Sequence, residues 1–307
     1  MLPGMEAGLA AEALVRGESL TGAELLHWRA GQLRLGGRAA DLDWLIDLAG
    51  GVRWADLQRL RLQPGQLLKL QCSCQQLAEL WRRHLTTFEP LQYLVGCCPW
   101  RDLELRVAAG VLIPRPETEL LLEWALATAP RPDRGGCWAD LGTGSGCLAL
   151  ALSRALPGWR GLAVDCSAEA LQQAAQNLAA HGLAERVALL QGSWWQPLQP
   201  WWGQLDLVLA NPPYIPSAVV DGLEPGVRLH EPRLALDGGC DGLEPIRCIV
   251  DVAPRALAPG GWLLLEHHHD QSEAVAELLG RAGLVEHQVR CDLEGQRRFA
   301  MARRRPP

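Results

Sequence analysis

The spacing of apolar and polar residues along the chain changes near residue 86. Before that point, apolar positions recur with the spacing of short amphipathic helices. Thr21–Glu24 has the form of a capping box that opens a helix, as does Ser73–Gln76, and Asp41 is a candidate N-cap for a helix over 42–49. The pattern predicts a small helical bundle over residues 1–85, with a core of leucine and tryptophan.

From Cys137 onward, short apolar runs typical of strands alternate with helical stretches. This alternation predicts right-handed βαβ units and a parallel sheet covered by helices on both faces. Two closely spaced runs, near Val285–Val289 and Phe299–Ala302, predict a hairpin at the edge of that sheet. The other predicted strands are Cys137–Leu141, Gly161–Val164, Val187–Leu190, Leu205–Ala210 and Trp262–Leu265.

Residues 86–115 lack a helical period and separate the helical part of the chain from the part in which strands and helices alternate. Leu103, Leu105 and Val107 alternate with charged residues, which predicts a strand or hairpin that links the halves. Pro116 suits the first turn of a helix that runs to about Ala129. The predicted organisation is a helical domain over 1–85, a linker or hairpin over 86–115, and an α/β domain over 116–307.

Composition and charge narrow the class of protein. The chain has 307 residues, of which 48% are hydrophobic and 21% charged, as in globular proteins. No apolar run approaches the roughly 18 residues of a membrane span. Met1–Ala10 contains Glu6 and does not resemble a signal peptide. The net charge is −6, with +1 over residues 1–86 and −7 over the rest, which argues against electrostatic binding of nucleic acid.

The cysteines and histidines do not predict a metal site. The chain has 10 cysteines but no pair with CxxC spacing, so we expect neither a zinc site nor a disulfide framework. Buried thiols in the reducing cytosol are the better interpretation. The run His267–Asp270 resembles a metal cluster, but neighbouring side chains after a strand alternate faces, so we expect no metal.

A glycine-rich turn follows the first predicted strand of the α/β domain. Gly142-Thr143-Gly144-Ser145-Gly146 precedes a predicted helix, and Asp165 ends the next predicted strand, where it can accept hydrogen bonds from ribose hydroxyls. The dinucleotide fingerprint requires glycine at position 147, where Cys147 stands. Asp140 adds a negative charge near the place of a ligand ammonium group. The pattern therefore favours S-adenosylmethionine over NAD.

The fourth predicted strand runs into Asn211-Pro212-Pro213-Tyr214, at the edge of the sheet where ligands bind. Pro212 and Pro213 lack an N–H group, so the Pro212 carbonyl is expected to be a fixed acceptor beside the Asn211 carboxamide oxygen. Two acceptors can hold both hydrogens of an –NH₂ group and orient its nitrogen toward a methyl donor. Tyr214 can stack on a planar acceptor group and exclude water. The segment predicts methylation of an amide or an exocyclic amine.

Further segments resemble the HemK/PrmC family of N5-glutamine methyltransferases, which modify peptide chain release factors. The resemblance runs from about residue 86 to the end of the chain. Besides the glycine turn and Asn211–Tyr214, the matching segments are Glu89–Gly96, Val111–Glu119, Glu231–Gly239, Asp241–Leu243 and Leu264–His267. It implies a Rossmann-like α/β domain with a seven-stranded sheet, preceded by a small helical bundle that docks the release factor.

The resemblance also implies roles for individual residues. Gly142–Gly146 and Asp165 would bind S-adenosylmethionine, which leaves as S-adenosylhomocysteine, and Trp194 would lie against the adenine. Asn211 would touch both cofactor and substrate, while Asn211, Pro212, Pro213 and Tyr214 would hold the glutamine of a Gly-Gly-Gln motif in class 1 release factors. The family usually has an acidic residue where Ser193 stands, so we expect weaker binding of the adenine amino group.

Three alternatives share part of this pattern. A related enzyme methylates a glutamine of a large-subunit ribosomal protein, but Arg115–Glu119 matches the release-factor enzymes better. An adenine-N6 methyltransferase would use the same two acceptors, although it needs phosphate contacts that the acidic second half does not favour. A binding protein without turnover would be expected to have lost Asn211 or the glycine turn, and both are present.

Overall fold

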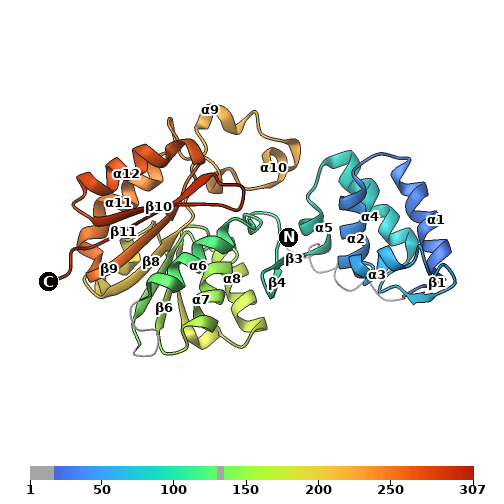
Figure 1. Cartoon of the computed structure of the whole chain (residues 1–307), viewed down its shortest axis with the longest axis horizontal. Helices are drawn as coiled ribbons and strands as arrows, with labels where there is room; N and C mark the ends of the chain where they lie inside the picture. The colour runs from blue at the N-terminus through green and yellow to red at the C-terminus, as the bar shows by residue number, and fades with distance from the viewer. Residues whose placement is uncertain (1–16, 130–134) are drawn as a thin grey trace, which may run out of the picture. The chain divides into compact units, whose positions relative to one another are not determined.

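The computed structural model describes residues 17–129 and 135–307. The chain divides into two compact units, Met1–Cys97 and Cys98–Pro307, and Figure 1 labels most of their helices and strands. The segment Met1–Ala10, in which we expect no signal peptide, lies outside the described residues, as does the beginning of the predicted domain 1–85.

The first unit is a bundle of short helices with one small pair of strands. Leu25, Leu42, Leu45, Leu77 and Trp81 are fully buried in its core. Both predicted capping boxes are present, at Thr21 and at Ser73. The helices are α1 (Gly22–Leu33), α2 (Ala39–Leu48), α3 (Trp54–Arg59), α4 (Cys74–Thr87) and α5 (Leu91–Val95), and β1 (Ser19–Thr21) pairs antiparallel with β2 (Leu67–Lys69).

Two predictions for this unit are wrong in detail. Helix α2 begins at Ala39 with Arg38 as its N-cap residue, so Asp41 lies inside the first turn. There its carboxylate accepts bonds of 2.8 and 2.9 Å from Arg38 and lies near the positive end of the helix dipole. Helix α5 lies in a segment that we expected to lack helical structure. The sequence did not indicate this helix because its five residues are too few to show a helical period.

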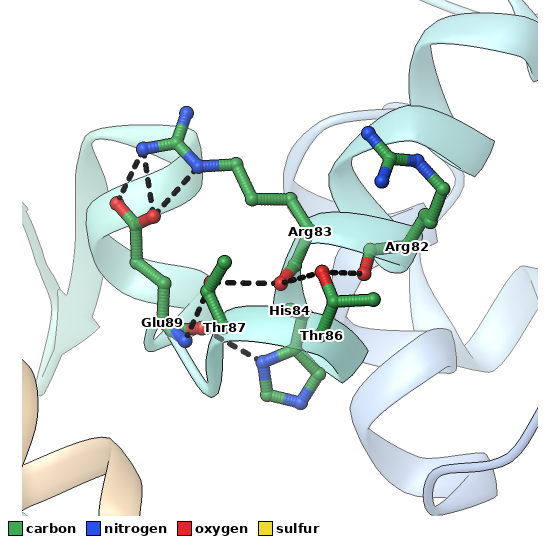
Figure 2. A network of polar contacts seen from close by, with 6 residues as sticks. All are labelled: Arg82, Arg83, His84, Thr86, Thr87 and Glu89. Atoms are coloured by element: carbon green, nitrogen blue, oxygen red, sulfur yellow. Dashed lines mark hydrogen bonds and ion pairs between the residues drawn. The ribbon is translucent and has the colours of Figure 1, made fainter.

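A polar network fixes the turn between α4 and α5 (Figure 2). Phe88 ends α4 in the left-handed conformation, with φ of 60°. Arg83 donates to both carboxylate oxygens of Glu89, at 2.7 and 2.9 Å, and His84 Nδ1 lies 2.8 Å from the Glu89 carbonyl oxygen. Glu89, the first residue of a segment that carries the family resemblance, therefore ties the turn to the last turn of α4.

The second unit contains a seven-stranded sheet in the order β10-β11-β9-β8-β5-β6-β7. The five strands from β9 to β7 are parallel, and β10 and β11 form the predicted antiparallel hairpin at the edge. The strands are β5 (Cys137–Leu141), β6 (Arg160–Asp165), β7 (Val187–Gln191), β8 (Leu205–Ala210), β9 (Leu257–Glu266), β10 (Val285–Cys291) and β11 (Arg297–Arg303). A separate hairpin joins β3 (Cys97–Trp100) to β4 (Leu103–Arg106), as the alternation at 103–107 predicts.

Helices cover both faces of the sheet (Figure 1), and most residues of the central parallel strands β5, β6 and β8 are buried. One apolar core joins the sheet to α6 (Thr118–Thr128), α7 (Cys147–Ala155) and α8 (Ala168–Ala180). The other core joins it to α11 (Glu244–Ala256) and α12 (Ser272–Arg281). Helix α6 begins at Thr118 rather than at Pro116, because 115–119 first form a turn with bonds from Thr118 N to Arg115 O and from Glu119 N to Pro116 O.

A long excursion between β8 and α11 holds three short helices, α9 (Ser217–Val220), α10 (Pro225–His230) and η3 (Arg233–Ala235). Its two ends are tied together, since Ile215 N donates to Leu236 O at 3.0 Å and Gly238 N donates to Ile215 O at 2.8 Å. Arg233 bonds Asp221 at 2.7 Å and Asp237 at 3.0 Å, which closes the excursion on itself. It begins directly after Asn211–Tyr214.

None of the helices in the described residues is long and apolar enough to cross a membrane. Within the described ranges no cysteine forms a disulfide. Four cysteines are buried, but Cys166, Cys240, Cys248 and Cys291 are exposed, so the expectation of buried thiols holds only in part.

Candidate functional site

The glycine turn lies between the end of β5 and the beginning of α7, at the carboxyl edge of the sheet. Gly142, Gly144 and Gly146 all have positive φ, at 78°, 55° and 80°, a region that other residues rarely adopt. The N–H groups of Gly142 and Thr143 donate to Val164 O, each at 2.9 Å. A Cβ atom at Gly146 would lie 2.9 Å from the Cβ of Ala174, whereas one at Gly144 would meet no protein atom within 4 Å. The turn therefore needs glycine for its own packing and leaves open space beside Gly144.

Asp165 ends β6 beside this turn. One carboxylate oxygen accepts from Gly144 N at 2.9 Å, and the other accepts from Ser167 N at 2.9 Å. Each carboxylate oxygen can accept more than one bond, so Asp165 can hold the glycine turn and still accept from a ligand. It also lines the large cavity described below.

Asp140 lies beneath the glycine turn and is 1% exposed. Its Oδ2 accepts from the Thr143 hydroxyl at 2.7 Å, while its Oδ1 is buried without a partner among the described residues. Burial raises the pKa of Asp140 to about 7, with a smaller contribution from the charge of Asp165. A buried acceptor without a donor is a place where a cationic ligand group would be stabilised.

A cavity of about 890 Å³ extends from the glycine turn to the end of β8. It is large enough for a nucleoside-sized ligand. Of the residues predicted to bind a cofactor, Asp140 and Gly146 do not line the cavity. The predicted residues that line it are Gly142, Thr143, Gly144, Ser145, Asp165, Ser193, Trp194 and Asn211. Trp194 has a positive φ of 47°, and its ring is the group that a Cβ at Gly142 would approach, at 3.2 Å.

Asn211 stands where two cavities meet. It lines the large cavity and also a neighbouring one of about 200 Å³, which Pro212 and Tyr214 line as well, whereas Pro213 lines only the large one. No donor of the described residues bonds the Pro212 carbonyl oxygen. The structure thus brings the predicted substrate residues to the boundary between a nucleoside-sized space and a smaller one.

Hydrogen bonds to two other elements orient Asn211. Its Nδ2 donates to Thr118 Oγ1 at 3.0 Å, and that hydroxyl donates to Glu266 Oε2 at 2.7 Å. The Tyr214 hydroxyl lies 3.5 Å from the other oxygen of Glu266. Burial raises the pKa of Glu266 to about 7, although the bond from Thr118 lowers it. Burial also raises the pKa of Tyr214, so its hydroxyl stays protonated.

Glycines and one glutamine hold the backbone of Tyr214. Gln271 Nε2 donates to Tyr214 O at 2.9 Å and to Gly242 O at 3.2 Å. A Cβ at Gly242 would lie 2.3 Å from Tyr214 O, and one at Gly238 would lie 2.8 Å from Tyr214 Cα. The glycines after the excursion therefore allow close contact with the Asn211–Tyr214 segment.

An ion pair joins two of the segments that carry the resemblance. Arg115 donates to Glu231 at 2.6 Å, and the other oxygen of that buried carboxylate accepts from Ile113 N at 3.2 Å. Arg115 lines both cavities. The pair therefore fixes the second half of the excursion to the wall of the site.

Sequence reasoning missed the supporting roles of Thr118, Glu266, Gly242 and Gln271. The first three stood in segments quoted for the resemblance, but no local pattern shows that Thr118 meets a residue 148 positions away. His267, which we considered as a metal ligand, is fully buried, and its Nδ1 lies 2.8 Å from the His268 carbonyl oxygen. Within residues 17–129 and 135–307 there is no group of three His, Cys, Asp or Glu placed to hold a metal ion.

The sheet order and the glycine turn beside a nucleoside-sized cavity define the class: an S-adenosylmethionine-dependent methyltransferase. Residues 116–221 match the family described as "Methyltransferase small domain". The fold is shared with the hMettl16 catalytic domain in complex with MAT2A 3'UTR hairpin 6, with a TM-score of 0.57 at 17% identity over 71% of this chain and 83% of that chain.

Sequence comparison defines the family more closely. A release factor glutamine methyltransferase of Prochlorococcus marinus is 50% identical over 285 residues, which is 92% of this chain and 96% of that protein. One of Thermosynechococcus vestitus is 42% identical over 280 residues, covering 90% of this chain and 96% of its own length. The chain belongs to the release factor glutamine methyltransferase family, and the resemblance seen in its sequence is confirmed.

Proposed function

We propose that this protein transfers a methyl group from S-adenosylmethionine to the side-chain amide nitrogen, N5, of the glutamine in the Gly-Gly-Gln motif of class 1 release factors. The observation that supports this most directly is the position of Asn211 between the two cavities. The larger space accommodates a nucleoside with an amino-acid tail, and the smaller one accommodates a side chain. S-adenosylhomocysteine is the second product.

The residues around the larger cavity suit S-adenosylmethionine. Asp140 Oδ1, which is buried and has no partner among the described residues, would stabilise the ammonium group when ionised, and Asp165, which lines the cavity, would provide acceptors for the ribose hydroxyls. Trp194 would provide a flat apolar surface for the adenine, and the exposed Ser193, which lines the same cavity, would meet its amino group. When bound, the cofactor supplies a methyl group already activated by a sulfonium centre.

The chain's own contribution to the reaction is to hold a weak nucleophile in place. A carboxamide nitrogen has a delocalised lone pair, so positioning and electrostatics must provide most of the rate. Asn211 Oδ1 and Pro212 O can each accept one hydrogen of the substrate –NH₂ group, which fixes its direction and draws electron density toward nitrogen. Pro213 and Tyr214 would border the glutamine and exclude water.

Labelled methyl transfer tests this function. The purified protein should label intact release factor, and should not label a factor whose motif glutamine is replaced by another residue. Ribosomal protein and nucleic acid are the two further arms, because both remained as alternatives in the sequence. Label on either one, without label on the release factor, would refute the proposal.

We further propose that the enzyme acts in the cytoplasm, and that residues 86–115 link a helical domain over 1–85 to a catalytic domain over 116–307. We also propose that the helical domain docks another part of the release factor. Support for docking comes from exposed apolar side chains: Trp54 is 59% exposed, Leu62 86% and Leu67 77%. Leu62→Ser and Leu67→Ser should raise KM for intact release factor but not for a short peptide around the motif. An unchanged KM for the intact factor would contradict docking by this surface.

A further inference from the structure

The hydroxyl of Thr118 connects Asn211 to a buried carboxylate. It lies 3.0 Å from Asn211 Nδ2 and 2.7 Å from Glu266 Oε2. Thr118 is 3% exposed and Glu266 1% exposed, so water does not compete for these bonds. Thr118 begins helix α6 and Glu266 ends strand β9, so two rigid elements hold the contact from opposite sides.

The number of hydrogens in this contact decides its direction. A hydroxyl carries one hydrogen, and an ionised carboxylate can only accept. Thr118 must therefore donate to Glu266, and the only role left toward Asn211 is that of an acceptor. The –NH₂ end of the Asn211 carboxamide faces Thr118 for this reason, and the Oδ1 end is turned away from it. A carboxamide is nearly symmetric in shape, so packing alone does not distinguish its two ends.

We propose that Thr118 and ionised Glu266 are positioning residues that determine which end of the Asn211 carboxamide meets the substrate amide. The inference rests on the proposed function, in which Asn211 Oδ1 accepts a hydrogen of the glutamine –NH₂ group. With the carboxamide reversed, two –NH₂ groups would face each other and the substrate would lose one acceptor.

Protonation of Glu266 would remove this control. A protonated carboxyl can donate to Thr118, whose own hydrogen then turns toward Asn211 and favours the reversed carboxamide. Burial raises the pKa of Glu266 to about 7, so the change falls in an accessible range of pH. The ionisable groups around it are Glu117, whose charge raises this pKa, Arg298, which lowers it, and Tyr214, whose hydroxyl lies 3.5 Å away. His267, next along the strand, is buried and its pKa is lowered, so it stays neutral.

Substitutions at Thr118 test the direction of the bonds. Thr118→Val keeps the size of the side chain but leaves the Asn211 –NH₂ group without an acceptor, so we expect the single-turnover rate to fall roughly 10- to 100-fold. The dissociation constant of the cofactor should stay within about twofold. Thr118→Ser should recover most of the rate. The matched control is Thr128→Val at the other end of α6. Among the described residues its hydroxyl bonds only Trp124 O and Ala125 O of its own helix, so this variant should behave as the parent protein.

The pH profile separates positioning from a purely structural role. The single-turnover rate of the parent protein should fall on the acid side of about pH 7, following Glu266. Glu266→Gln should be slower and lose this acid limb. An unchanged rate in Thr118→Val, or an acid limb that persists in Glu266→Gln, would overturn the inference.

A readout that needs no turnover keeps this inference apart from the proposed function. In the cofactor-free protein the Asn211 side-chain amide protons should exchange slowly with solvent, and distinctly faster in Thr118→Val. Equal exchange in the two proteins would overturn the inference, even where the parent protein methylates release factor. Conversely, a parent protein that fails to methylate release factor would refute the proposed function, and this exchange comparison would still decide the inference.

Discussion

Asp165 serves both the protein and its ligand. Its two carboxylate oxygens hold Gly144 N and Ser167 N at 2.9 Å each, and the same side chain lines the large cavity. We predict that Asp165→Ala raises the dissociation constant of S-adenosylmethionine roughly 10- to 100-fold, through lost bonds to the ribose and a less ordered turn. Calorimetric titration measures this constant directly.

Asp206 provides the matched control for this substitution. It is also an aspartate that accepts from a backbone N–H, that of Cys137 at 2.9 Å, but it lies at the opposite end of the parallel strands. Asp206→Ala should leave cofactor affinity nearly unchanged. If Asp165→Ala bound the cofactor as tightly as Asp206→Ala does, the assignment of Asp165 to the ribose would be wrong.

The place of a single residue in the site could be predicted where a local sequence pattern, such as a strand followed by a turn, determines it. The glycine turn and Asn211–Tyr214 each follow a strand, Asp165 ends one, and the carboxyl ends of parallel strands share one edge of the sheet. Thr118 and Glu266 could not be found in this way, because their contact depends on how α6 packs beside β9. Asp140 was predicted to lie near a ligand ammonium group. In the structure its Oδ2 accepts from the Thr143 hydroxyl at 2.7 Å, and its Oδ1 has no partner among the described residues.

At the scale of elements, close contact between two segments of backbone shapes the site. A Cβ at Gly242 would lie 2.3 Å from Tyr214 O, and the φ of Gly242 is 75°. We therefore predict that Gly242→Ala displaces Tyr214 and lowers the single-turnover rate by about tenfold or more, because a shift of about 1 Å in a positioned group costs that much. Quench-flow kinetics with saturating cofactor measures this rate.

Gly283→Ala distinguishes this contact from simple backbone strain. Gly283 has a similar φ of 77°, but a Cβ there would meet no atom within 4 Å. Both variants should lose some thermal stability, and only Gly242→Ala should lose turnover. An equal loss of turnover in both would show that the contact with Tyr214 is unimportant.

The elements themselves were predictable where they are long or fully buried. Strands β5 and β8 have the predicted bounds because all or nearly all of their residues are buried, and each sequence is apolar apart from one aspartate, Asp140 in β5 and Asp206 in β8. Strand β9 begins at Leu257, five residues before its predicted start at Trp262. Its first part contains Pro259, Gly260 and Gly261, which resemble a turn in the sequence and lie at a register shift against β8, between Leu257 and Trp262.

At the scale of the whole molecule, two buried carboxyl groups link stability to pH. Burial raises the pKa of Asp140 and of Glu266 to about 7 in the folded chain, whereas the unfolded chain has ordinary, lower values. The folded state therefore binds more protons between about pH 4.5 and 7, and stability falls as the pH rises through this range. Glu266→Gln removes one of these groups. The quantity to compare is the melting temperature of Glu266→Gln minus that of the parent protein. This difference should be larger at pH 8 than at pH 5, by on the order of 5 °C. An equal difference at both pH values would contradict the raised pKa.

The domain organisation was predicted from a change in the spacing of apolar residues along the chain, since helical spacing and short apolar runs require different packing. The structure divides the chain at Cys97, within the segment 86–115 that we expected to link the two parts. The many tryptophans had no explanation in the sequence. In the structure Trp81, Trp100 and Trp138 are among the largest fully buried side chains, so part of the excess fills the cores of both units.

In the proposed reaction, Asn211 Oδ1 and Pro212 O hold the substrate carboxamide. Single-turnover methyl transfer by Asn211→Ala, with cofactor already bound, measures how much this grip contributes. The variant should fold and bind S-adenosylmethionine as the parent protein does, while its rate falls roughly 10- to 100-fold because one substrate N–H is left without an acceptor. A rate close to that of the parent protein, at equal cofactor occupancy, would show that Asn211 does not hold the substrate.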